Sequence, residues 1–155
     1  MTRRHFVLAL LASTIVLPGV SEAPAASGGD PVQAEELAGT WRLVGVRDSD
    51  TGRYFAFDGG LAEATVAEID ADGRMSATGG CNTIMARLSR DGATWRIGPP
   101  ATTRMACLEP DMADAERSII KALETAGDLA FDGDTVTFVD SGGAALLVML
   151  RENRE

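Results

Sequence analysis

Few residues in this 155-residue chain could carry out chemistry: it has one histidine, His5, and two cysteines, Cys81 and Cys107. His5 lies at the start of an apolar segment that is typical of a removable export signal. Without that segment the chain has no histidine, which excludes Ser-His and Cys-His catalysis, an imidazole base and His-ligated metal sites. We therefore expect a protein that is not an enzyme, with no catalytic residue, no bound metal and no cofactor.

Cys81 and Cys107 favour a disulfide over a catalytic thiol. An even number of cysteines in an exported chain is usually paired, because the compartment is oxidising. The hairpin predicted between them doubles back and could bring its two ends together. Such a bridge would contribute on the order of 2–4 kcal/mol. Two buried free thiols are the alternative, favoured if the chain folds before it is exported.

The N-terminus has the three parts of a secretory signal. A basic start is followed by an apolar stretch over residues 6–20 and then by small residues that include an A-x-A pattern ending at Ala25. We predict a signal peptide over residues 1–25, with cleavage after Ala25. The apolar stretch is short for a membrane span, which needs about 20 residues. We expect no stable span after cleavage, and a retained anchor is the alternative.

Arg3-Arg4 leaves the export route open between the twin-arginine and Sec pathways. No cysteine lies at the predicted cleavage site, which argues against a lipid-anchored protein. Residues 26–36 are small, polar and proline-containing, so they predict a flexible leader. The expected location is the periplasm or the cell exterior.

The rest of the chain, residues 37–152, has the pattern of one mainly β (α+β) domain. Short apolar runs alternate with turn signals, which is typical of strands joined by hairpins. Strands are expected at residues 39–46, 53–57, 64–69, 74–78, 83–89, 94–97, 128–131, 135–139 and 145–150. One amphipathic helix is predicted at about 112–126, with Asp111 as N-cap and Gly127 as C′ residue. A sheet of this kind must close or cover its edges, which favours a single antiparallel barrel-like or strongly curled sheet.

The charge of the chain excludes a broad class of partners. The net charge of −9 disfavours nucleic acid as a partner, because binding of nucleic acid needs a basic surface.

The acidic clusters at residues 48–52 and 70–73 resemble fragments of calcium loops, but they lack the later ligands and are better explained as hairpin turns. Trp41 and Trp95 are expected in the core.

Two motifs carry a family resemblance. The element Gly79-Gly80-Cys81-Asn82 is followed about 25 residues later by Thr102-Thr103-Arg104-Met105-Ala106-Cys107. With the segments around residues 39–43 and 132–136, they resemble the META domain (HslJ-like) family from about residue 37 to 151. The resemblance implies a compact barrel-like domain with one late helix. It also implies an envelope or stress-associated protein, as in heat-shock-induced members, with no established enzymatic activity.

The signature residues of these motifs have two interpretations. They could line a binding site for a small ligand or a peptide, or they could fix the loops beside the cysteines through hydrogen bonds. The second is favoured, with Arg104 bonding loop carbonyls or a carboxylate. The signature residues are Gly80, Asn82, Thr102, Thr103, Arg104 and Met105.

We thus expect a monomeric, exported binding or structural module that acts on an envelope protein or a small ligand. A small β-barrel inhibitor of a secreted protease is the first alternative. A lipocalin-like carrier is the second, and it requires an open apolar cavity of about 300 Å³ or more.

Overall fold

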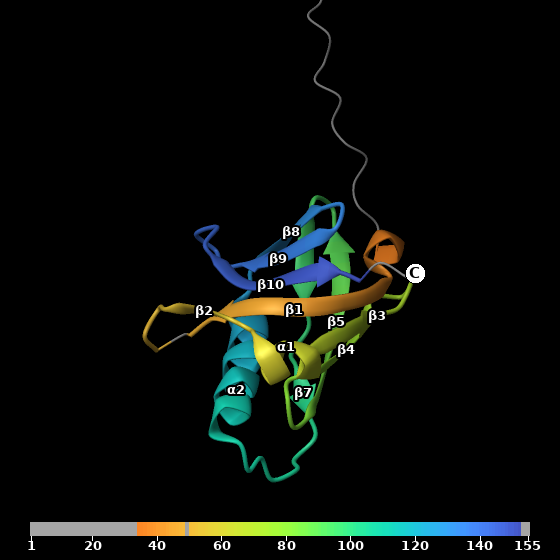
Figure 1. Cartoon of the computed structure of the whole chain (residues 1–155). Coiled ribbons are helices and arrows are strands. Elements are labelled where there is room, and N and C mark those ends of the chain that lie inside the picture. The colour runs from red at the N-terminus through yellow and green to blue at the C-terminus, as the bar shows by residue number, and fades with distance from the viewer. Residues whose placement is uncertain (1–33, 49, 153–155) are drawn as a thin grey trace, which may run out of the picture.

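A computed structural model describes residues 34–48 and 50–152 of the chain (Figure 1). The predicted signal peptide, residues 1–25, and most of the predicted leader lie outside the described residues. Residues 34–36 were expected in the leader, but they belong to a 3-10 helix, η1 (Ala34–Leu37), that packs onto the domain. Leu37 is fully buried and its carbonyl accepts a bond from Trp41 Nε1 at 2.8 Å, so the fold begins slightly earlier than expected.

Ten strands form the main part of the secondary structure and follow the predicted runs closely. The strands at residues 74–78 and 83–91 alternate buried with more exposed residues, which is the pattern of a sheet with one face on a core. The strands are β1 (Gly39–Arg47), β2 (Tyr54–Ala56), β3 (Val66–Ile69), β4 (Arg74–Thr78), β5 (Thr83–Asp91), β6 (Thr94–Ile97), β7 (Ala101–Thr102), β8 (Asp128–Asp132), β9 (Thr135–Val139) and β10 (Ala145–Arg151). The two-residue strand β7 was not expected.

All strand pairs are antiparallel, and the sheet curls almost into a barrel. The strand order is β6-β5-β4-β3-β1-β10-β9-β8, with β2 beside β1 and β7 beside β5. The two end strands meet at a seam, where the backbone N–H of Trp95 in β6 donates to Asp128 Oδ1 in β8 at 2.8 Å. The predicted barrel-like antiparallel fold is confirmed, and the seam leaves little exposed edge for aggregation.

The interior of the curled sheet is filled by large apolar side chains. Trp41, Leu43, Phe138 and Met149 are at most 1% exposed and belong to one continuous core. Trp95 is also buried, so both tryptophans lie in the core as expected. Side chains therefore fill the interior of the barrel, whereas a lipocalin-like carrier needs an open cavity there to hold its ligand.

The amphipathic helix is present as α2 (Pro110–Thr125), with its apolar stripe packed on the sheet (Figure 1). Its start differs from the prediction: Glu109 is the N-cap residue, and Asp111 lies within the first turn. Pro110 explains the shift, because its fixed φ suits the first helical position. The chain leaves the helix through an extended Ala126, so Gly127 is not needed in a left-handed conformation.

A second, short helix, α1 (Gly59–Ala64), was not expected. It occupies part of the segment between β2 and β3, and β3 therefore starts at Val66 rather than at residue 64. Thr65, directly after the helix, is fully buried, and its hydroxyl donates to the Leu61 carbonyl at 2.8 Å. A helix of this length carries too few residues for a periodic pattern to be visible in the sequence.

The β5–β6 and β8–β9 hairpins each contain an Asp-Gly dipeptide, Asp91-Gly92 and Asp132-Gly133. Asp91 pairs with Thr94, so Asp91 still belongs to the strand and Gly92 opens the two-residue turn with a φ of +63°. The β8–β9 hairpin follows the same plan, with Gly133 at a φ of +58°. Glycine is favoured there because other residues are strained at positive φ.

The acidic turns at residues 48–52 and 70–73 are hairpin connections, as expected. Asp70 Oδ1 accepts the backbone N–H groups of Asp72 and Arg74 at 2.9 and 2.8 Å. The N–H of Arg74 is the main reason that the pKa of Asp70 is lowered below 3.8. The pKa of Asp48 is lowered as well, mainly by the hydroxyl of Thr51, which donates at 2.7 Å.

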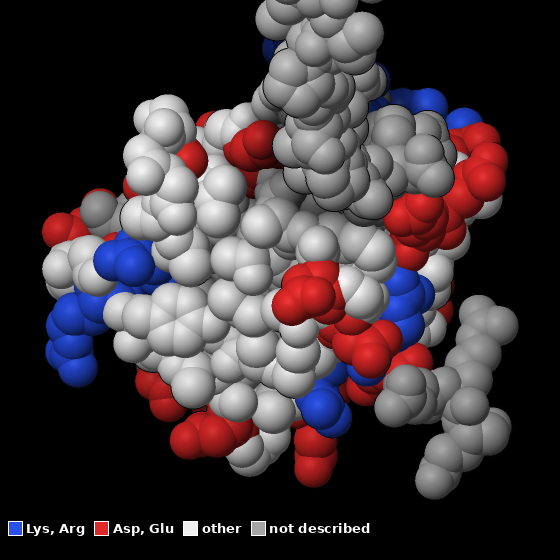
Figure 2. Space-filling model, turned by 90° about the horizontal axis from the view of Figure 1, so that it is seen from above, with Lys and Arg blue, Asp and Glu red and all other residues white. Residues whose placement is uncertain are grey.

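Charged side chains are distributed unevenly over the surface. Seen from above, much of the face is uncharged; basic residues lie toward its rim, and acidic residues lie at the rim and also near the middle (Figure 2). The basic residues on this face lie at separate places rather than in one broad patch.

Candidate functional site

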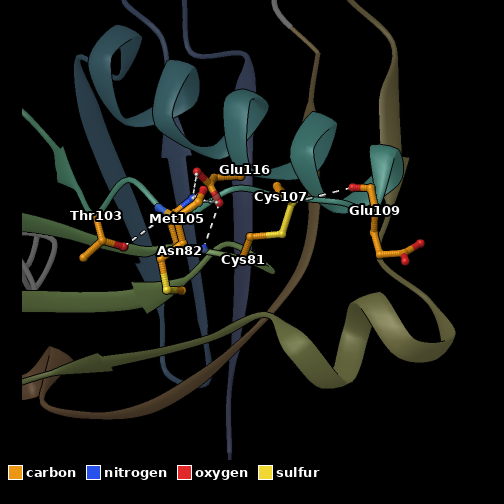
Figure 3. The surroundings of a disulfide bond; sticks show 7 residues. All are labelled: Cys81, Asn82, Thr103, Met105, Cys107, Glu109 and Glu116. Atoms are coloured by element: carbon orange, nitrogen blue, oxygen red, sulfur yellow. Dashed lines mark hydrogen bonds between the residues drawn. A yellow bond between two sulfur atoms is a disulfide. The ribbon is translucent and has the colours of Figure 1, made fainter.

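The two signature motifs meet at one end of the barrel, beside the start of α2 (Figure 3). Gly79 to Asn82 form the tight connection between β4 and β5. The second motif begins with Thr102 in β7 and continues through residues 103–109, which we call the signature loop, to the first residue of α2. Segments more than 20 residues apart in sequence are thus held side by side.

A disulfide joins the two motifs. Cys81 and Cys107 are bonded, with their Cα atoms 5.5 Å apart and a sequence separation of 26 residues. The predicted pairing is therefore present, and it fixes the signature loop to the β4–β5 connection. The Cys107 sulfur also lies 3.6 Å from the Glu109 carbonyl oxygen, at the point where the loop enters the helix (Figure 3).

Asn82 is the centre of the hydrogen bonds that hold this end of the barrel. It is 6% exposed, and its amide pairs with both backbone groups of Met105: Oδ1 accepts the N–H at 2.7 Å, and Nδ2 donates to the carbonyl at 3.3 Å. This geometry imitates a strand pair, with a side chain in place of one backbone. The conformation of the loop at Met105 is thereby fixed.

The same asparagine binds the carboxylate of Glu116 from α2. Nδ2 lies 2.9 and 3.1 Å from the two carboxylate oxygens, and the backbone N–H of Asn82 donates to Oε2 at 2.9 Å. Hydrogen bonds to a charged acceptor are stronger than neutral ones. Glu116 therefore ties the helix to both signature motifs through Asn82.

Thr103 completes the network from the other side. Its hydroxyl donates to Asn82 Oδ1 at 2.9 Å and accepts the backbone N–H of Thr83 at 3.1 Å. The Thr102 hydroxyl donates to the adjacent Thr103 carbonyl at 3.1 Å. In the part of the chain that the structure describes, every buried side-chain nitrogen and oxygen has a hydrogen-bond partner. Asn82 and Thr103 therefore have the structural role that the sequence favoured.

The paired glycines allow the helix to approach. A Cβ on Gly79 would lie 3.0 Å from Glu116 Cγ, and a Cβ on Gly80 would lie 3.0 Å from Met112 Cβ. Gly80 also has a φ of +112°, which other residues rarely adopt. Glycine at position 80 is thus favoured both by close packing and by backbone conformation, and Gly79 lies close to Glu116 of the helix.

The side chains of Arg104 and Met105 take no part in the hydrogen bonds that hold the loop among the described residues. Arg104 is exposed, and no interaction of its side chain with another described residue is present, so the predicted bond to a loop carbonyl or carboxylate is wrong. The Met105 side chain is 64% exposed and that of Leu108 is 88% exposed. Exposed apolar side chains on a fixed backbone are typical of binding surfaces.

Two residues at this site were missed by sequence reasoning. Neither Glu116 nor Leu108 was among the signature residues expected from the sequence. The signal for Glu116 was its position one turn after Met112, on a helix whose start follows directly on the second motif. Nothing in the sequence indicated how far Leu108 would be exposed.

Within the described residues, no group of three or more His, Cys, Asp and Glu side chains is arranged to hold a metal ion. None of the described helices is both long and apolar enough to cross a lipid bilayer.

The fold and this site define a small antiparallel barrel domain in which a disulfide and a buried asparagine hold one exposed loop. The META domain family model matches residues 34–153, and the chain belongs to that family. Among curated proteins, none matches this chain.

Solved structures support the fold. An NMR structure of a protein from Burkholderia xenovorans has a TM-score of 0.57 and 21% sequence identity, and the match covers 89% of this chain and 100% of that one. A crystal structure of a DUF4847 family protein from Bacteroides vulgatus has a TM-score of 0.51 and 15% identity, covering 76% of this chain and 95% of that one. At these identities the similarity concerns the fold alone.

Proposed function

We propose that this META-domain protein is an exported, non-enzymatic binding module, and that the signature loop is its contact with a partner in the cell envelope. The observation that carries the proposal is the pairing of Asn82 with both backbone groups of Met105. A loop fixed in this way loses little conformational entropy on binding, so its exposed side chains can bind more tightly. A role in envelope stress tolerance would follow the family resemblance.

Two features support export. The N-terminal sequence has the layout of a signal peptide, and the Cys81–Cys107 disulfide suits an oxidising compartment. We expect the mature protein to begin after Ala25, which the intact mass of protein recovered from the periplasm would show. Full-length protein in the cytoplasmic fraction would contradict the proposal. Replacement of Arg3-Arg4 by Lys-Lys should stop export only if the route is twin-arginine dependent.

The absence of enzymatic activity is supported by the residue types available. Both cysteines are joined in the disulfide, and the only histidine in the sequence lies in the predicted signal. The carboxylate of Glu116, which contacts the first signature motif, already accepts hydrogen bonds from the backbone and the side chain of Asn82. A nucleophile with an adjacent base is therefore not present among these residues.

Site-specific photo-crosslinking in intact cells tests the loop. A photoreactive phenylalanine at Met105 or Leu108 should give one discrete crosslinked product, because both side chains are exposed on the loop. The same group at Thr94, exposed in the β5–β6 hairpin, is the matched control. Products of equal yield from Thr94, or no product from the loop, would contradict a binding role.

A second candidate is an inhibitor of a secreted protease. The observation in its favour is the same exposed loop, because inhibitors of this kind present a preorganised segment to the active site of the enzyme. Stoichiometric inhibition of a periplasmic protease that is lost in Met105→Asp would favour it. If the protein inhibits none of the periplasmic proteases, the inhibitor candidate is wrong and the envelope-partner proposal remains.

A further inference from the structure

A groove of about 560 Å³ lies between α1 and the start of α2, next to the end of the signature loop. Phe55, Leu61 and Met112 supply its apolar surface, and each of them remains accessible at least in part. Met112 also packs against Gly80, so the wall on that side is continuous with the signature motifs. The groove is thus an apolar surface supported by the rigid part of the domain.

Four carboxylates surround this apolar surface: Asp58, Glu109, Asp111 and Asp114. No Lys or Arg among the described residues lines the groove. Of the four, only Asp114 has an ion-pair partner among the described residues, namely Arg117. The side chains that line the groove therefore give it a net negative charge over an apolar floor.

Two of these carboxylates lie where a capping hydrogen bond would be expected, and neither makes one. Asp58 is the N-cap residue of α1 and Glu109 is the N-cap residue of α2, but neither side chain bonds the backbone of its helix. N-cap side chains normally stabilise a helix by accepting such a bond. These two carboxylates are accordingly available to an external partner.

We propose that this groove binds a cationic peptide segment that also carries apolar side chains. Lysine or arginine side chains of the segment would lie at the carboxylates, and its apolar side chains would cover Phe55, Leu61 and Met112. Charge complementarity of this kind selects the partner and guides its approach. An acidic segment would be repelled, and a simple polyamine would leave the apolar surface uncovered.

This inference rests on the proposed function and names the class of partner. Glu109 belongs both to the signature loop and to the groove, at the end of the loop that enters α2 (Figure 3). A segment seated in the groove would therefore extend onto the loop and reach Leu108. The loop would then provide further apolar contact with the same partner.

The test uses the folded protein and a fluorescein-labelled peptide of alternating lysine and leucine, with binding followed by fluorescence anisotropy. We expect saturable binding that weakens as sodium chloride is raised, because exposed charges are screened by salt. A peptide with glutamate in place of lysine should not bind. A peptide with serine in place of leucine should bind more weakly, because it cannot cover the apolar surface.

A triple variant isolates the carboxylates: Asp58→Asn, Glu109→Gln and Asp111→Asn. An exposed ion pair changes affinity by up to about fivefold, so removing three should weaken binding by about tenfold or more. The matched control removes the same charge elsewhere, through Glu35→Gln, Asp132→Asn and Glu152→Gln, all of which are exposed. Circular dichroism of both variants confirms that they are folded.

Three results would overturn the groove proposal: no binding of the lysine–leucine peptide, equal weakening in the two triple variants, or equal affinity for the lysine–serine peptide. The second would indicate only a response to net charge. Failure of the proposed function would look different, because crosslinking from Met105 and Leu108 would then give no product. If crosslinks persist but groove variants change nothing, only the groove assignment is wrong.

Discussion

The substitution Asn82→Asp tests whether the asparagine holds the signature site together. It preserves the shape of the side chain, and Oδ1 can still accept from Thr103 and from the Met105 N–H. The amide nitrogen, however, is replaced by an oxygen at the position that lies 2.9 Å from Glu116 Oε1. The hydrogen bonds that Nδ2 donates, one shared between the two Glu116 carboxylate oxygens and one to the Met105 carbonyl, are lost with it.

The expected destabilisation follows from two effects of the same sign. Two like charges about 4 Å apart repel by about 4 kcal/mol at an effective dielectric constant of about 20. A buried hydrogen bond to a charged group contributes about 1.5–3 kcal/mol. Glu116 can rotate toward solvent and recover part of this energy, because it is only partly buried. We expect a loss of about 2–4 kcal/mol at pH 7, measured by urea denaturation with the disulfide intact.

The loss should depend on pH with a definite sign. Two adjacent carboxylates in the folded variant retain a proton more strongly than they do in the unfolded chain. Where the folded state binds more protons, stability falls as pH rises, so the deficit relative to the parent should shrink between about pH 7 and pH 4.

The double variant Asn82→Asp with Glu116→Gln is the matched control. The glutamine amide can donate to the carboxylate at position 82, and its oxygen can accept the backbone N–H. Most of the stability at pH 7 should return, and the pH dependence should disappear. A parent-like stability of Asn82→Asp alone, or a deficit of the same size at pH 4 and pH 7, would refute the assigned role of Asn82.

Further predictions concern the bridge, the paired glycines and the acidic turns. Replacing Cys81 and Cys107 together by alanine should cost about 3.5 kcal/mol, from the loop-entropy relation for a separation of 26 residues, and urea denaturation under oxidising conditions would measure it. Gly80→Ala should cost about 1–3 kcal/mol, because its Cβ crowds α2 and its φ is positive; a thermal shift below about 3 °C would contradict this. The pKa of Asp70 should be below 3.8 in an NMR titration and should stay lowered in Arg74→Gln, because the backbone N–H of that residue is the largest cause. The stability that this carboxylate contributes is present above the unfolded-state pKa and is lost as pH falls through its lowered value.

The sequence predicted the barrel because its hairpins depend on local signals. Alternating apolar residues and Asp-Gly dipeptides depend on neighbours in sequence, and they placed most strands within one or two residues. The start of α2 was misplaced because two start signals competed: Asp111 is a good N-cap type, but Pro110 before it already fits the first helical turn. The short helix α1 has no periodic signal of its own, and its end is fixed by the burial of Thr65.

The signature site could be predicted only in part, because some of its contacts join residues that are far apart in the sequence. The disulfide and the structural role of Asn82 and Thr103 followed from residue type, because cysteines pair in export compartments and short polar side chains bond nearby backbone. The partner of Asn82 lies 34 residues away on a helix, and no local rule predicts such a contact. Whether Arg104 found a partner depended on that same arrangement, and there the expectation was wrong.

The signature residues fall into two groups: residues that stabilise the fold, and residues whose side chains are exposed. Gly80, Asn82 and Thr103 serve the fold: one admits the helix and the other two hold the loop, so substitutions there should lower stability first. Arg104 and Met105 contribute nothing visible to folding through their side chains, which are exposed. Substitutions at these two exposed positions should therefore leave the free energy of unfolding close to that of the parent. The fixed backbone and the exposed side chains are therefore best understood together, as a support and the surface that it presents.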